Sequence, residues 1–154
     1  MGILGPQAFS RVILIGDAAC QVKATTGGGV VMLVSAAQIA ARGLIKAVEG
    51  SQYSRSFFQE EYQLPCENTI GRELKVHYLI HLFLKRLTPT DWDKIIGLLN
   101  TSEVKGLFSI YGEMDFPKTF LLKLLGNARV FMQIANLLGK NLSIFRDLLR
   151  IWRR

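Results

Sequence analysis

Cysteine is scarce in this sequence: Cys20 and Cys66 are the two cysteines among 154 residues. They form no C-x-x-C pair, and the start of the chain carries no signal-peptide pattern. This usage is typical of a chain kept in a reducing compartment and does not indicate a disulfide framework. We therefore expect a cytoplasmic protein.

Long apolar runs are also lacking, although hydrophobic residues make up 49% of the chain. That fraction excludes general disorder and fits one domain with a packed core. The longest weakly polar stretch, residues 27–41, is interrupted by Ser35 and Gln38. It falls short of the roughly 20 apolar residues that cross a bilayer. The sequence predicts that this stretch is a helix buried against a sheet and not a transmembrane span.

Acidic residues are fewer than basic ones, 12 against 19, which gives a net charge of +7. The imbalance lies mainly in residues 101–154, which hold nine Lys and Arg against four Asp and Glu. Because this third of the chain is also apolar, its charge favours a membrane surface as a partner over a nucleic acid. We expect no nucleic-acid partner.

The most informative stretch is a short apolar run followed by an acidic turn and a glycine-rich loop. Residues 12–15 predict a strand covered on both faces, and the loop Thr26-Gly27-Gly28-Gly29 leads into a helix over 29–48. In the turn Gly16-Asp17-Ala18, the ionised Asp17 can only accept hydrogen bonds, which suits the hydroxyls of a ribityl or ribose chain. Glycines at a helix start let a phosphate or an electron-rich ring edge approach backbone N–H groups. Together these features predict a flavin or nucleotide site.

The chain after residue 50 is predicted to be helical. One helix is expected to begin near Ser54, to be kinked or broken at Pro65 and to resume over 69–87. A helix capped by Thr88 follows. Further helices are expected over 102–110, 117–125, 128–138 and 142–153. The strand 12–15 has no predicted neighbour in the eleven residues that precede it, so we expect an orphan strand.

Residues 16–29 read GDAACQVKATTGGG and resemble the second flavin-binding motif of the FAD-dependent superfamily that includes the aromatic hydroxylases. Within it they look most like the geranylgeranyl reductase family, whose pattern is close to GDAAGQVKPTTGGG. Cys20 stands where Gly is usual, and Ala24 where Pro is usual. The segments GRELK (71–75) and YGEMDFP (111–117) resemble the helical C-terminal portion of the same reductases. An aromatic hydroxylase is disfavoured, because the His usual at the position of Cys20 and the Asn usual near Val31 are absent.

The resemblance implies a mainly α fold: one orphan β-strand and a helix from a split FAD-binding α/β domain (residues 1–50), followed by an α-helical C-terminal region (51–154). The GxGxxG half that holds the ADP part of FAD is absent from the sequence. The chain therefore looks like the C-terminal fragment, or a split subunit, of such an enzyme. The expected partners are a missing N-terminal half or a second copy of the chain.

The resemblance also implies FAD as the cofactor and a prenyl lipid as the substrate. Asp17 would accept hydrogen bonds from the ribityl chain or lie beside the pyrophosphate, and N–H groups of the loop would face the pyrimidine edge of the flavin. The implied cofactor-binding residues are Gly16, Asp17, Ala18, Thr26, Gly27, Gly28 and Gly29. Reduced FAD would give a hydride to a prenyl C=C bond, with a proton from an unassigned donor, so no catalytic residue is named.

Two alternatives stay open. In the first, the chain is a non-catalytic helical module that binds a membrane surface or a partner protein. In the second, it is another flavoprotein oxidoreductase or monooxygenase. The tail 140–154 bears on the first alternative, because Leu142, Phe145, Leu149 and Trp152 form an apolar stripe among basic residues. This tail is interpreted either as a peripheral membrane contact or as a helix docked on its own protein.

A possible metal-ligand spacing and a possible redox thiol are both interpreted as structural features. Glu73, His77 and His81 share one face of a predicted helix, a spacing that suits a metal, but we interpret them as a polar seam and expect no metal site. Cys20 is interpreted as a small replacement for glycine and not as a redox thiol, because no base or second thiol is near it in sequence.

Overall fold

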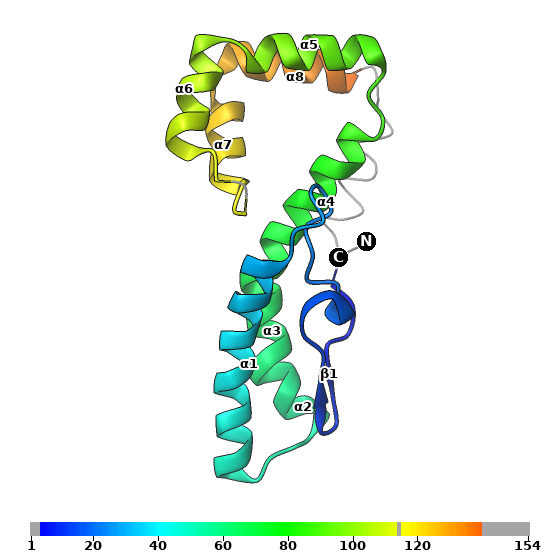
Figure 1. Ribbon diagram of the computed structural model, residues 1–154, viewed down its shortest axis with the longest axis vertical. Helices are drawn as coiled ribbons and strands as arrows, with labels where there is room; N and C mark the ends of the chain where they lie inside the picture. The colour runs from blue at the N-terminus through cyan, green and yellow to red at the C-terminus, as the bar shows by residue number, and fades with distance from the viewer. Residues whose placement is uncertain (1–3, 114, 140–154) are drawn as a thin grey trace. The chain divides into compact units, whose positions relative to one another are not determined.

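The computed structural model describes residues 4–113 and 115–139, which form two compact units that divide between Tyr78 and Leu79 (Figure 1). The predicted mainly α fold is confirmed: the described residues hold two strands of two residues each, and the rest of the regular structure is helical. The predicted helical stretch over 142–153 lies outside the described residues.

The predicted strand over 12–15 is shorter than expected and has a partner. Strand β2 (Val12–Ile13) pairs antiparallel with strand β1 (Ala8–Phe9), with Ala8 opposite Ile13. The chain reverses through Arg11, whose φ of 62° is left-handed, and no Asn-Gly or Asp-Gly pair marks this turn in the sequence. The expectation of an unpartnered strand is therefore wrong. The expectation that the strand is covered on both faces is also wrong, since Val12 is 52% exposed.

Helix α1 (Val30–Gly50) matches the prediction over 29–48. It packs mainly on helical segments, and its Ala47 also lies against Ala8 of the two-stranded sheet. Its small residues Ala36, Ala40, Gly43 and Ala47 are buried. A Cβ on Gly43 would lie 3.3 Å from the carbonyl oxygen of Glu61, so α1 approaches the backbone of the segment η2 (Gln59–Gln63) closely. The close approach of α1 is therefore to helical backbone.

A continuous helical segment then runs from residue 55 to residue 84. It comprises α2 (Arg55–Phe58), the π-helical η2, α3 (Leu64–Cys66), the π-helical η3 (Glu67–Gly71) and α4 (Arg72–Leu84). The predicted interruption at Pro65 takes the form of these two flanking π-helical turns, and the chain stays helical. A π-turn shifts the hydrogen-bond register locally, which accommodates the missing N–H of proline.

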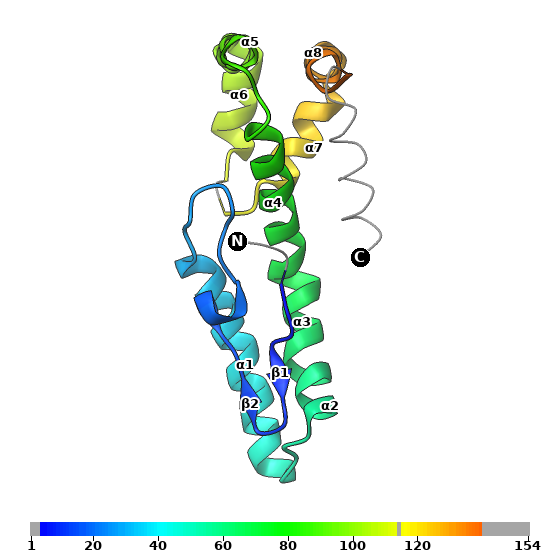
Figure 2. The ribbon, with the colours of Figure 1, turned by 90° about the vertical axis from the view of Figure 1, so that its right-hand side faces the viewer.

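The hairpin β1–β2 lies along this segment and α1, as Figure 2 shows. Ala8, Ala47 and Phe58 form a buried cluster, with Ile13 and Phe57 packed against it. Residues 51–78 thus share a core with residues 8–47. The boundary at residue 50 between an FAD-binding segment and a helical C-terminal region rests on the flavin motif and stays a prediction.

The second unit contains α5 (Pro89–Leu99), α6 (Ser102–Tyr111), α7 (Lys118–Gly126) and α8 (Ala128–Gly139). The predicted start at Thr88 is confirmed in detail, because Thr88 and Asp91 form a reciprocal capping box. The predicted break at Gly126-Asn127 is also confirmed. Leu98, Val104, Leu124 and Val130 form the core of this unit.

Candidate functional site

The acidic turn predicted at residues 16–18 is a short 3₁₀ segment, η1 (Gly16–Ala19). Its two ends need left-handed backbone, with φ of 72° at Gly16 and 57° at Cys20. The backbone N–H of Gly16 donates to Oε1 of Gln21 over 2.7 Å, and the N–H groups of Cys20 and Gln21 donate to the carbonyls of Asp17 and Gly16. The turn is therefore closed by its own backbone, and the Asp17 side chain is exposed.

A buried polar network holds this turn on the helical segment. Nε2 of Gln21 donates to Oε1 of Gln7 over 3.0 Å and to the hydroxyl of Tyr62 over 2.9 Å, and that hydroxyl donates to the carbonyl of Leu14 over 2.6 Å. Gln7, Gln21 and Tyr62 are fully buried. Burial raises the pKa of Tyr62 well above its usual range, so the phenol stays protonated and serves as a structural donor. This network was not predicted from the sequence, because no spacing pattern points to it.

The glycine-rich loop is closed by bonds of its own. The N–H of Lys23 donates to the carbonyl of Gly28 over 3.1 Å, and the N–H of Gly27 donates back to the carbonyl of Lys23 over 2.9 Å. The N–H of Gly28 donates to Oγ1 of Thr26 over 3.3 Å. In this conformation the N–H groups of Gly27 and Gly28, predicted to face a flavin, donate within the loop.

The loop delivers the chain to an open helix start. Gly29 is the N-cap of α1 and provides no side-chain cap, so the first N–H groups of the helix have no intrahelical acceptor. Oδ1 of Asp17 lies 3.5 Å from the point that a Cβ on Gly29 would occupy. The structure thus brings together two of the predicted residues, Asp17 and Gly29: an exposed carboxylate and an uncapped helix N-terminus.

This pairing can bind a ligand with two kinds of group. The carboxylate accepts hydrogen bonds from hydroxyls, and the helix start attracts negative or electron-rich atoms through its N–H groups and its dipole. A carboxylate alone repels a free anion, so the arrangement favours a ligand that carries hydroxyls on one side and an acceptor-rich edge on the other. A flavin with its ribityl chain has both.

Two side chains from outside the predicted set support the loop. Oγ1 of Thr25 lies 2.8 Å from Nδ1 of His77 in α4. The side chain of Lys23, 8% exposed, lies under the loop, with its Cε 3.1 Å from the Cβ position of Gly28. A side chain at Gly28 would require the end of the Lys23 side chain to shift.

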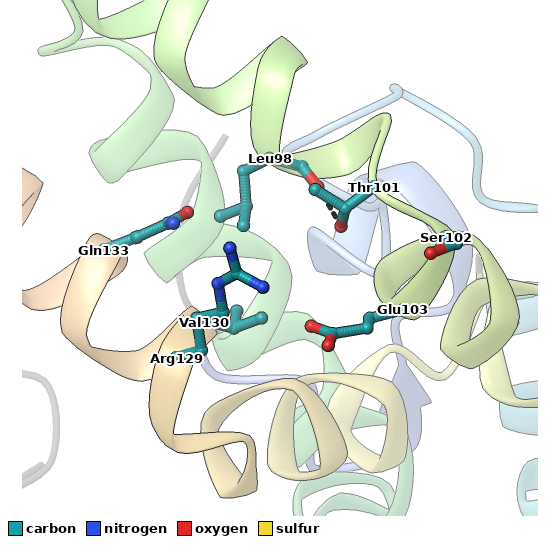
Figure 3. Close-up of a pocket in the computed structure, with 7 residues that line it drawn as sticks. All are labelled: Leu98, Thr101, Ser102, Glu103, Arg129, Val130 and Gln133. Carbon is teal, nitrogen blue, oxygen red and sulfur yellow. Dashed lines mark hydrogen bonds between the residues drawn. The ribbon is translucent and has the colours of Figure 1, made fainter.

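The second unit has a separate cavity of about 310 Å³ between α5–α6 and α8 (Figure 3). Arg129 from α8 extends its guanidinium into this space opposite Glu103 and close to Leu98, and Thr101 donates to the carbonyl of Leu98 over 2.8 Å. The lining mixes both charges with neutral polar groups, so it selects no class of ligand. It shares no residue with the predicted site.

The structure also bears on the metal and thiol interpretations. Among the described residues, no three His, Cys, Asp or Glu side chains are grouped so as to hold a metal ion. His77 of the predicted seam is 3% exposed. Cys20 and Cys66 are both free thiols, the first exposed and the second buried.

Helix α1 also passes a length-and-composition test for a membrane-spanning helix over residues 30–49. The core helix of a soluble protein passes the same test, and a third of this window is buried within the protein. The test therefore does not decide where the chain resides.

Comparison with known proteins places these features in context. No family model matches the chain, and no solved structure does. An uncharacterized protein of Methanocaldococcus jannaschii is 26% identical over 149 residues, which cover 97% of this chain and 35% of the relative.

Proteins named digeranylgeranylglycerophospholipid reductase match as well. One from Methanosphaera stadtmanae is 28% identical over 79% of this chain and 32% of its own length, and one from Methanosarcina mazei is 24% identical over 61% and 23%. The chain thus spans about a third or less of the curated relatives it matches. These matches support a relationship between this chain and the geranylgeranyl reductases.

Proposed function

We propose that this chain is the C-terminal part, as a fragment or a split subunit, of an FAD-dependent reductase that acts on the prenyl C=C bonds of isoprenoid lipids. The observation that carries the proposal is the pairing of the Asp17 carboxylate with the uncapped start of α1. The names of the reductase relatives supply the substrate class.

The residues present fit a flavin. Asp17 would accept hydrogen bonds from the ribityl hydroxyls, and the helix start at Gly29 would face the ring edge that becomes negative when the flavin is reduced. Gly16, Ala18 and Thr26 would shape the turn and the loop around these two groups. The hydride for the prenyl double bond would come from reduced FAD when it is bound, and the chain's own part would be to bind and orient the cofactor.

The exposed face of α1 supports the view that further protein completes the site. Val30, Val34, Ile45 and Val48 are each at least half exposed along this helix. Soluble proteins rarely leave a contiguous apolar face of this kind uncovered. We infer that the N-terminal portion of a reductase, or a second copy of this chain, packs on this face.

The test is reconstitution. The full chain would be mixed with the portion of the M. jannaschii relative that the match does not cover, and FAD binding would be followed by the shift in flavin absorbance. We expect a complex that retains flavin and that loses it when Asp17→Ala is introduced. Glu49→Ala, an exposed acidic position at the far end of α1, is the matched control and should leave binding unchanged. The proposal would be contradicted if the mixed proteins retained no flavin. It would also be contradicted if the Asp17→Ala variant bound FAD as tightly as the wild type.

A membrane-binding module is the second candidate, and α7 and α8 favour it. Residues 116–139 contain no Asp or Glu, and Leu122, Phe131 and Met132 are each more than half exposed. Basic charge beside exposed apolar side chains suits an anionic bilayer. The proposed peripheral contact through residues 140–154 lies outside the described residues and stays part of this proposal, as does location in the cytoplasm or on its membrane face.

Vesicle flotation separates the two candidates. A membrane module should float with phosphatidylglycerol vesicles and not with phosphatidylcholine vesicles, and Phe131→Ser with Met132→Ser should abolish flotation. Flotation without flavin binding in any reconstitution would favour the module, whereas flavin retention favours the reductase.

A further inference from the structure

The glycine-rich loop is joined to α4 by a partly buried hydrogen bond. Oγ1 of Thr25 and Nδ1 of His77 lie 2.8 Å apart, although the residues are 52 positions apart in sequence. His77 is 3% exposed, so water cannot readily replace Thr25 as its partner. The imidazole is carried by a regular helix of 13 residues, which fixes its position.

The bonds within the loop define its shape but not its place in the unit. Lys23 closes the loop through its own N–H and carbonyl, which bond to Gly28 and Gly27. Both partners of each bond belong to residues 23–28, so these bonds join the loop to itself and not to another element. Thr25 stands inside this closed loop, and its bond to His77 ties the loop to a helix that is distant in sequence.

The position of the loop matters because it sets the start of α1. Gly29 follows directly, and Oδ1 of Asp17 lies 3.5 Å from its Cβ position. Asp17 is held separately, through Gln21, which bonds both the turn and Tyr62. The two halves of the candidate site are therefore fixed by different residues of the same helical segment: Tyr62 for the acidic turn and His77 for the loop.

We propose that His77 is a positioning residue, which holds the loop 23–29 through the Thr25 hydroxyl so that the start of α1 faces the same ligand as Asp17. The identity of that ligand as a flavin rests on the proposed function. Threonine suits this role because its hydroxyl can donate or accept, so the bond forms with either imidazole tautomer.

The test measures the loop directly. Amide hydrogen exchange of the full chain would be followed by mass spectrometry over residues 23–33. His77→Leu and Thr25→Val remove the bond, and each should accelerate exchange of this segment about tenfold. His77→Asn, whose amide replaces the Nδ1 position of the ring, should stay within about threefold of the wild type. His81→Leu, on the same helix, is the control and should leave this segment unchanged.

A double variant strengthens the design. If His77 acts through Thr25, the combination of His77→Leu with Thr25→Val should exchange no faster than either single variant. Unchanged exchange in both single variants, or additive acceleration in the double variant, would overturn the inference. Thr25→Val keeps the test decisive if the loss of a buried histidine prevents His77→Leu from folding.

FAD titration of the same proteins, reconstituted as above, reports on the ligand. We expect His77→Leu to weaken FAD binding about tenfold and His77→Asn to restore it. If the wild type binds no FAD, the proposed function fails, while the exchange data still decide whether His77 holds the loop.

Discussion

The side-chain amide of Gln21 donates a 2.9 Å hydrogen bond to the hydroxyl of Tyr62, across 41 positions of sequence. Gln21 also accepts the N–H of Gly16, and Tyr62 also donates to the carbonyl of Leu14. Two buried side chains thus connect the acidic turn to the π-helical segment η2. The geometry of Asp17, which lies inside this turn, depends on them.

Tyr62→Phe tests this connection. The variant keeps the ring but leaves the Leu14 carbonyl and one N–H of Gln21 without their partner, which should lower the free energy of unfolding by about 1–3 kcal/mol. Chemical denaturation followed by circular dichroism measures the change. Tyr53→Phe, at an exposed position, is the control and should alter stability by less than about 0.5 kcal/mol. If the two variants lowered the free energy of unfolding equally, the hydrogen bonds of the Tyr62 hydroxyl would not stabilise the fold.

Cys20→Gly should stabilise the chain. Cys20 adopts a left-handed backbone with φ of 57°, a conformation that costs a residue with a side chain about 1 kcal/mol and glycine almost nothing. The expected gain is about 0.5–1 kcal/mol in thermal or chemical unfolding. Cys20→Ala keeps the Cβ and should show no gain, which separates a backbone effect from removal of the thiol. A stabilised Cys20→Ala would contradict this explanation.

The features predicted correctly from the sequence are those with a local physical cause. Thr88 with Pro89 and Asp91 specifies a helix start through neighbouring residues, and the structure contains that capping box. The end of α7 follows from Gly126-Asn127 in the same way.

The features missed depend on residues far apart in sequence. Tyr62 and His77 each look like ordinary members of an amphipathic helix, and their roles emerge only when the chain folds back over 41 and 52 positions. The hairpin was missed because its turn uses Arg11 in place of glycine. At Pro65, the flanking π-turns preserve the helix where a local rule predicts an interruption. Of the candidate site, the sequence identified Asp17 and Gly29 but not the residues that hold them.

Gly27 and Gly106 make a matched pair of glycines, because a Cβ at either would meet nothing within 4 Å. Gly27 has a φ of 71°, so Gly27→Ala should destabilise the chain by about 1 kcal/mol through its backbone alone. Gly106 lies inside α6, so Gly106→Ala should stabilise it by about 0.5–1 kcal/mol. Opposite shifts in the unfolding midpoint are expected, and shifts of the same sign would contradict this interpretation.

Burial of Cys66 makes stability depend on pH in the alkaline range. Burial raises the pKa of the Cys66 thiol from 9.0 to about 11. The folded chain therefore keeps a proton that the unfolded chain releases near pH 9, and the stability contributed by this group is lost as pH rises. The contribution is complete below about pH 8, falls between about pH 9 and 11 and amounts to about 3 kcal/mol in all.

Denaturation curves at pH 8, 9, 10 and 11 measure this loss. Cys66→Ala should flatten the fall between pH 9 and 11, whatever its stability at pH 8, because it removes the titrating thiol. Cys20→Ala should retain the fall, since Cys20 is exposed. Tyr62, whose pKa is also raised by burial, adds a further loss at higher pH, so the combination of Cys66→Ala with Tyr62→Phe should be flatter still. An unaltered pH profile in Cys66→Ala would mean that this thiol ionises in the folded chain as readily as in the unfolded one, which its complete burial argues against.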